Sequence, residues 1–167
     1  MKRTLILVRH AKSDWSTAGQ ADFDRPLNER GKRDAPEMGG RLKAKGLQPD
    51  LILASPAKRA ASTARLVAGA LGYDAGNIRW IDRLYHCPAS VFEDVILESD
   101  IDDSVATLFI FAHNPGITNF ANETAPELDV DNIPTCGMVA VTFDADHWSD
   151  FVTAPHTLLF FDYPKNQ

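Results

Sequence analysis

The residues best suited to chemistry follow the first apolar run of the chain, residues 4–8, where Arg9 and His10 stand side by side. A run of β-favouring or apolar residues without a polar break predicts a strand buried on both faces, and open α/β sheets bind ligands at the carboxyl ends of such strands. A guanidinium offers a planar fork of donors to phosphate, and a neutral imidazole can attack phosphorus or pass a proton. The pair indicates phosphoryl chemistry, although a strand that simply ends in water would carry the same residue types.

Two further predicted strand ends carry the same residue types. Arg59 lies in the first turn of a predicted helix after the apolar run 51–54, where free backbone N–H groups favour anions. His113 follows the apolar run 108–112 and precedes a turn-forming Asn-Pro-Gly. Taken alone, Arg59 or His113 could equally well have a structural role. Together with Arg9 and His10, however, they would neutralise and hold a phosphoryl group.

Strands and helices alternate along the chain, which predicts a layered α/β fold. Asn28, Ser55 and a Ser90–Glu93 capping box are expected to begin helices. Helices are expected at 28–45, 55–71 and 90–99 and from 117 onward, and strands at 4–8, 51–54, 78–81, 106–112, 138–143 and 157–161, the last two as an antiparallel edge.

Length and composition suit one compact domain over residues 1–167, with 44% hydrophobic residues. Cys87 and Cys136 are the only cysteines and lack the spacing of a disulfide framework, so a reducing compartment is expected. The sequence has no signal-peptide pattern, and no apolar run reaches the roughly 18 residues that span a bilayer. We expect a soluble cytoplasmic protein without membrane contact.

Charge is divided unevenly along the chain. The net charge is −6, but residues 1–83 hold 16 Lys and Arg against 9 Asp and Glu, whereas residues 84–167 hold 1 against 14. An acidic chain disfavours nucleic acid as a partner. The basic half can attract an anionic substrate, or it can simply form solvated helix faces.

Other phosphatase chemistries lack their characteristic spacing here. Neither cysteine begins the Cys-to-Arg phosphate loop of thiol phosphatases, and the Asp22-Phe23-Asp24 segment follows no apolar strand, as an aspartyl nucleophile would require. The chain has no HExxH motif and its histidines are scattered, so no metal site is expected. His147 and His156 are expected to be structural or surface residues.

Four segments together resemble the histidine phosphatase superfamily, which is phosphoglycerate mutase-like, and within it the SixA-like phosphohistidine phosphatases. The segments follow the family's order over roughly residues 5–118 and contain its Arg-His signature, an Arg-Pro-Leu segment, a second arginine motif and a second histidine. The resemblance implies a three-layer α/β/α fold with a mainly parallel central sheet. The segments are 7–13, 24–27 with Gly31, 54–60 with Thr63 and Ala64, and 113–116.

The resemblance also implies roles for individual residues. His10 would be the nucleophile, forming a phosphohistidine that water hydrolyses. Arg9, Arg59 and His113 would surround the phosphoryl oxygens, with Arg25 as a further contact, so neither metal nor cofactor is implied. A cationic His113 would help most; nearby arginines oppose that state and a dianionic phosphate favours it.

The sequence departs from the mutase-like pattern where those members carry an acidic proton donor. Residues 83–87 contain no carboxylate, and Tyr85, His86, Asp14 and Asp24 remain open as donors. An alcohol leaving group needs a proton, whereas the imidazole that leaves phosphohistidine can be protonated within the substrate, so this departure favours phosphohistidine.

The chain departs from the pattern in two further ways. Ser16 stands where mutase-type members tend to carry asparagine, and the short chain leaves little room for cap insertions, so an open site and a protein substrate are favoured. We predict a phosphatase with a phosphohistidine enzyme intermediate, acting on phosphohistidine in a signalling or phosphotransfer protein. The alternatives are a phosphatase of a small phosphomonoester and a non-catalytic phosphate-binding module.

Overall fold

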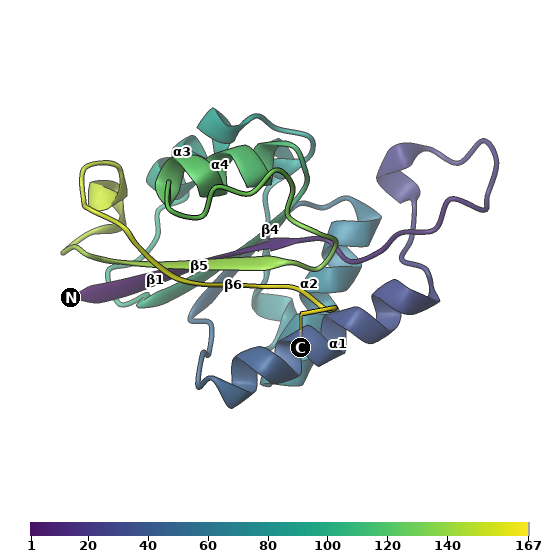
Figure 1. Ribbon diagram of the computed structural model, residues 1–167, viewed down its shortest axis with the longest axis horizontal. Coiled ribbons are helices and arrows are strands. Elements are labelled where there is room, and N and C mark those ends of the chain that lie inside the picture. The colour runs from purple at the N-terminus through teal and green to yellow at the C-terminus, as the bar shows by residue number, and fades with distance from the viewer. Residues whose placement is uncertain (167) are drawn as a thin grey trace.

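The computed structural model describes residues 1–166 as a six-stranded sheet in the order β3-β2-β4-β1-β5-β6, with helices on both faces (Figure 1). Helices α1 and α2 lie below the sheet in this view, and α3 and α4 lie above it. The strands are β1 Lys2–Arg9, β2 Leu51–Ala54, β3 Arg79–Trp80, β4 Thr107–Ala112, β5 Met138–Asp144 and β6 Thr157–Asp162, and the helices are α1 Glu29–Ala44, α2 Lys58–Leu71, α3 Ala89–Glu98 and α4 Gly116–Thr124.

The sheet is mainly parallel, as the sequence predicts. The pairs β1–β4, β4–β2 and β2–β3 are parallel, whereas β5 runs antiparallel to β1 and β6 antiparallel to β5. The expected antiparallel edge of two late strands is therefore confirmed. Because β1, β2 and β4 run the same way, their carboxyl ends share one edge of the sheet, next to the segment that leaves β1 and projects at the right of Figure 1.

Alternating residues of the central strands build two apolar layers. Ile6 and Val8 of β1 pack with α1 and α2, whereas Leu5 and Leu7 pack with α3 and α4. All four of these side chains are fully buried, and burying one large aliphatic side chain contributes about 1.5–3 kcal/mol. The near-continuous apolar sequence of β1 thus reflects a strand covered on both faces.

Three local expectations differ from the structure. Asn28 does cap α1, accepting the Gly31 N–H at 2.9 Å, but α2 begins at Lys58 with Ala57 at its N-cap, so Ser55 is not the cap. The Ser90–Glu93 box does not form, because α3 begins at Ala89 with Pro88 at its N-cap and no side-chain cap. Strand β3 is shorter than expected because the chain turns into a 3-10 helix directly afterwards.

The segment between β1 and α1 is tied down at its base. Ser13 and Leu27 form an isolated antiparallel bridge, and the Asn28 N–H donates to the Lys12 carbonyl at 3.0 Å. A Cβ on Gly31 would lie 2.2 Å from that Lys12 oxygen. Only glycine lets α1 approach the residues that follow His10 so closely.

Among the helices of residues 1–166, none has the length and apolar character needed to cross a bilayer.

We expect Gly31→Ala to destabilise the fold by about 1–3 kcal/mol, because the added methyl group must displace backbone. The matched control in the same helix is Gly40→Ala, where no atom lies within 4 Å of the added carbon. This control should gain about 0.5–1 kcal/mol from helix propensity. Urea denaturation of both variants tests the pair, and equal stabilities would show that the contact at Gly31 relaxes without cost.

Candidate active site

The shared edge of the sheet brings together the five residues singled out from the sequence. Arg9 ends β1, His10 and His113 follow β1 and β4 directly, and Arg59 lies in the first turn of α2. Arg25 reaches the same place from the segment between β1 and α1. All five line one pocket of about 180 Å³, whose other lining residues are Lys12, Ser13, Trp15, His86, Asn114 and Thr135.

His10 is held with one ring nitrogen free. Its Nδ1 lies 2.8 Å from the Ala11 carbonyl oxygen, and since a carbonyl only accepts, Nδ1 carries the proton. Burial lowers the pKa of His10 to about 3, with Arg59, Arg9 and Arg25 lowering it further against that hydrogen bond. The imidazole is therefore neutral, and Nε2 keeps the lone pair that a nucleophile needs.

His113 lies against His10, with ring centroids 5.3 Å apart. Its Nε2 is 2.8 Å from Ser55 Oγ, and its buried Nδ1 has no partner within residues 1–166. Burial lowers the pKa of His113 to about 2, and His10 and Arg59 act in the same direction. When Ser55 donates its hydroxyl proton to Nε2, the proton of the neutral ring sits on Nδ1 and is available to an acceptor.

The arginines concentrate positive charge beside these neutral rings. The pKa of Arg9 is lowered by burial and by the charge of Arg59, which shows that the two guanidinium groups repel each other. Arg9 Nη1 donates to the Ile133 carbonyl at 2.8 Å, a neutral acceptor. The Nε atoms of Arg9, Arg25 and Arg59 are buried without a partner in residues 1–166. A bound anion would offset this charge.

Asp22 is the carboxylate that holds two of these arginines. Its Oδ1 accepts from Arg25 at 3.0 Å, and its Oδ2 accepts from Arg59 at 3.0 Å and from the Tyr85 hydroxyl at 2.6 Å. His86 Nε2 lies 2.8 Å from the same Oδ2. Although burial raises the pKa of Asp22, the hydrogen bonds from these four side chains hold it far below its usual range. Asp22 is therefore a permanent anion that orients the arginines and is no proton donor.

The sequence pattern presents Asp22 only as a candidate nucleophile and does not predict its hydrogen bonds with Arg25 and Arg59. The only local signal for this role is that Asp22 lies three residues before Arg25 in the chain. Tyr85 and His86 follow β3, 63 and 64 residues after Asp22. The structure also separates the four open proton donors. Asp14 accepts a hydrogen bond from the Ser16 N–H, and Asp24 lines a different hollow. His86 lines the pocket, and the Tyr85 ring lies next to His113 with the ring centroids 5.5 Å apart.

His86 occupies the outer part of the pocket. Its side chain is 49% exposed, whereas His10 is 7% exposed. The backbone of His86 has φ of 51°, a left-handed conformation that is uncommon for a histidine. The hydrogen bond with Asp22 fixes the ring in this position, 5.3 Å from the ring of His113.

Further contacts support Arg59 and Arg25. Thr63 Oγ1 accepts the Ala11 N–H at 2.9 Å and donates to the Arg59 carbonyl at 2.7 Å, so it links the turn after His10 to α2. Arg25 donates to Ser13 Oγ and lies under Trp15, with its guanidinium carbon 3.6 Å from the ring centroid. These contacts limit the movement of Arg25 and Arg59 before any ligand arrives.

The neutral state of His10 and His113 predicts a loss of stability in acid. Both pKa values fall from 6.5 in the unfolded chain to about 3 and about 2 in the fold, so protons bind the unfolded state more strongly below pH 6.5. The free energy of unfolding should fall as pH drops below 6.5, by up to about 1.4 kcal/mol per pH unit for each histidine.

Urea denaturation between pH 7 and about 4.5, where most carboxylates stay ionised, measures this slope. His10→Asn should make the slope shallower. Asp103 raises the pKa of His147, so His147→Asn should steepen the slope slightly, and only slightly because the pair is exposed. A slope that is the same in all three proteins would show that the buried rings do not stay neutral.

Comparisons with known proteins identify the family and the fold of this chain. A model of the histidine phosphatase superfamily (branch 1) matches residues 5–95. An uncharacterised protein of Mycobacterium tuberculosis is 34% identical over 168 residues, covering 95% of this chain and 100% of the relative.

Solved structures add the fold. A crystal structure assigned as the phosphohistidine phosphatase SixA of Agrobacterium tumefaciens is 28% identical, with a TM-score of 0.79 over 97% of this chain and 98% of that one. The protein histidine phosphatase SixA complexed with tungstate has the same fold, with a TM-score of 0.81 at 21% identity over 98% of both chains. The predicted phosphoglycerate mutase-like architecture is confirmed. The chain is thus a SixA-like member of the histidine phosphatase superfamily, and this membership supports phosphatase activity.

Proposed function

We propose that this phosphatase works through a phosphohistidine intermediate on His10 and removes phosphate from phosphohistidine in a signalling or phosphotransfer protein. The observation that carries the proposal is the state of His10. Its Nδ1 proton is held by the Ala11 carbonyl, its ring is neutral, and it lies in a pocket with three arginines. A neutral nitrogen surrounded by cations is suited to attack an anionic phosphoryl group.

The reaction consists of two displacements at phosphorus. In the first, the lone pair of His10 Nε2 forms a bond to phosphorus while the bond to the leaving nitrogen breaks and its electron pair stays with the leaving imidazole. In the second, water attacks the phosphorus atom while the bond from phosphorus to Nε2 breaks and its electron pair returns to His10. The proton that water loses passes to solvent, and the products are inorganic phosphate and neutral His10. Arg9, Arg25 and Arg59 stabilise the phosphoryl oxygens in both steps, so the proposal includes activity without a metal ion.

The proton supply of the site supports a phosphohistidine substrate. Asp22 is the carboxylate nearest the arginines, and its hydrogen bonds keep it ionised. The imidazole that leaves a phosphohistidine can carry its own proton, so it does not require a carboxylic acid from the enzyme. A phosphorylated protein is the partner that we propose on this basis.

A second candidate function is hydrolysis of small phosphomonoesters, and it is favoured by the position of His86. In-line attack by the deeply buried His10 directs the leaving group outward, towards the exposed part of the pocket where His86 lies. An imidazolium held by Asp22 could protonate an ester oxygen there. A non-catalytic phosphate-binding module remains the third alternative, and it would not need His10 as a nucleophile.

Transfer of labelled phosphate tests the nucleophile. The wild type should acquire an acid-labile label from a phosphohistidine protein in the presence of EDTA, and His10→Ala should lose label and turnover by about 10³-fold or more. The exposed variant His147→Ala is the control for folding and handling. Turnover by His10→Ala at the wild-type rate would contradict the intermediate, and wild-type phosphate binding without turnover of any substrate would support the binding module.

Dependence on the leaving group separates the two enzymatic functions. If His86 donates the proton, His86→Gln should slow hydrolysis of aryl phosphates with poor leaving groups by about 10²-fold or more and spare those with good ones. Tyr85→Phe removes another hydrogen bond to the same Asp22 oxygen and serves as the control. Equal losses for all leaving groups would show that His86 has only a positioning role, and faster wild-type turnover of phosphohistidine than of any ester would favour the protein substrate.

A further inference from the structure

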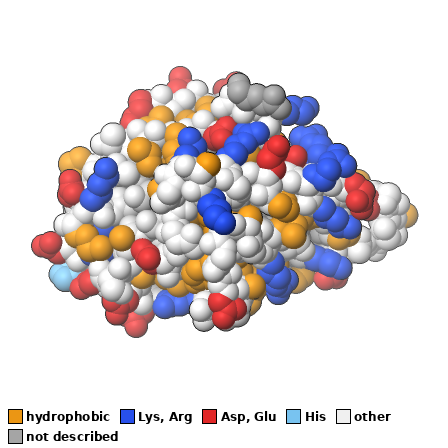
Figure 2. Space-filling view, turned by 90° about the horizontal axis from the view of Figure 1, so that it is seen from below, with side chains coloured by type: hydrophobic (Ala, Val, Ile, Leu, Met, Phe, Trp, Pro, Cys, Tyr) orange, Lys and Arg blue, Asp and Glu red, His pale blue; other side chains and the backbone are white. Residues whose placement is uncertain are grey.

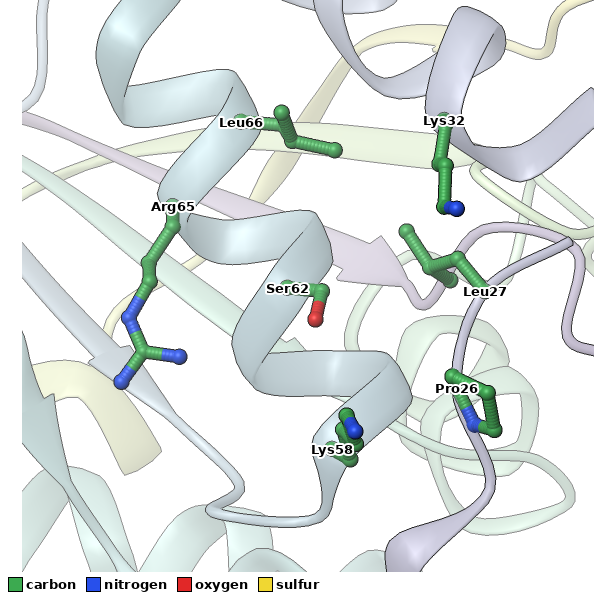
Figure 3. A pocket seen from close by; sticks show the side chains of 7 residues that line it. All are labelled: Pro26, Leu27, Lys32, Lys58, Ser62, Arg65 and Leu66. Carbon is green, nitrogen blue, oxygen red and sulfur yellow. The ribbon is translucent and has the colours of Figure 1, made fainter. Parts of the chain in front are cut away.

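A groove lies along α2, near the pocket that contains His10, which we call the phosphate pocket (Figure 3). It has a volume of about 460 Å³ and runs between α2 and the segment that leads into α1. In Figure 3, Leu66 and Ser62 point from α2 across the groove towards Leu27. The groove combines apolar with basic side chains, namely Pro26, Leu27 and Leu66 with Lys32, Lys58 and Arg65.

A second hollow of about 450 Å³ lies along the same helix and shares two basic residues with the groove, Lys58 and Arg65. Phe23 and Trp80 line this hollow and are 39% and 37% exposed. The Arg65 guanidinium carbon lies 4.7 Å from the centroid of the Trp80 ring. We call the groove and this hollow together the α2 surface. It offers apolar and aromatic contacts on both sides of two cations.

The two shared cations have no acidic partner in the described part of the chain. Lys58 and Arg65 are exposed, and no carboxylate of residues 1–166 forms an ion pair with either. Lys32 differs, because it lies 3.3 Å from Glu29, and Asp24 is the acidic residue that lines the second hollow. Figure 2, which views the molecule from below, shows blue side chains gathered towards the right-hand end with fewer red ones among them.

Residues consecutive in the chain line the α2 surface and the pocket that contains His10. Pro26 follows Arg25 directly and Lys58 precedes Arg59, and both of these arginines line the pocket. A small phosphate ester bound in the pocket, which has a volume of about 180 Å³, would not extend over the α2 surface. A polypeptide that places its phosphoryl group in the pocket is long enough to cover the α2 surface as well.

We infer that the α2 surface docks an acidic, partly apolar segment of the phosphorylated protein substrate. The inference rests on the proposed function, which supplies the protein substrate. Carboxylates of the segment pair with Lys58 and Arg65, and its apolar side chains cover Pro26 and Leu66, which are partly exposed. A nucleic acid could pair with the two cations, but it has no apolar side chains to cover the apolar part of the groove.

Two synthetic phosphohistidine peptides of equal length test the inference. One carries Asp, Glu and Leu around the phosphohistidine, and in the other Asn and Gln replace the acids. The enzymes are the wild type, Lys58→Glu/Arg65→Glu and the matched control Lys43→Glu/Lys165→Glu, which makes the same charge change at exposed sites outside the α2 surface. Lys58→Glu places an acid at the first turn of α2, which the helix dipole favours, so the variant should fold.

We expect the wild type to prefer the acidic peptide by about tenfold in kcat/KM, through KM, and to lose this preference at high salt. The double variant at Lys58 and Arg65 should lose the preference, the control should keep it, and all three should hydrolyse para-nitrophenyl phosphate equally. Equal turnover of both peptides by the wild type, or a preference that survives in the double variant, overturns the docking inference but leaves the proposed function in place. Hydrolysis of the aryl phosphate without turnover of either peptide overturns the proposed protein substrate and the inference with it.

Discussion

The parallel pairing of β1 with β4 fixes the positions of the two pocket histidines. Arg9 is in register with Ala112, so His10 and His113 are the next residues on neighbouring strands, and the His10 N–H still donates to the Ala112 carbonyl at 3.1 Å. Both strands are buried on both faces, so neither can slide without moving apolar side chains out of the two layers. The sheet therefore fixes the backbone positions of the two histidines, and the Ala11 carbonyl and the Ser55 hydroxyl then hold their rings.

The arginines create an electrostatic cost that the fold offsets only in part. Asp22 compensates for Arg25 and Arg59, while Arg9 has a neutral carbonyl as its partner. Full neutralisation by more carboxylates would stabilise the free protein, but it would also compete with a phosphoryl group for the same donors. Burial is the main cause that lowers the pKa values of His10 and His113, and the remaining positive charge acts in the same direction, so the charge that would attract a phosphoryl group also helps to keep the proposed nucleophile neutral.

The sequence predicted what depends on local pattern and missed what depends on distant partners. The buried strands follow from apolar runs, and Arg9, His10, Arg59 and His113 follow because each lies next to a strand end. Ser55 has the sequence of a helix cap, but its hydroxyl contacts His113, so a tertiary hydrogen bond decides its role. The role of Asp22 depends on partners up to 64 residues away, and no local pattern predicts that they meet.

The depth of His10 has a consequence for selectivity. A nucleophile at the inner end of a small pocket leaves room for the phosphoryl group, while the exposed ring of His86 marks the side where the remainder of the substrate enters solvent. Contacts within the pocket recognise the phosphoryl group, which all phosphorylated substrates share. Selectivity between substrates must then arise from contacts with surfaces outside the pocket. The surface lined by Pro26 and Lys58 is well placed for this, because these residues are adjacent in the chain to Arg25 and Arg59 of the pocket.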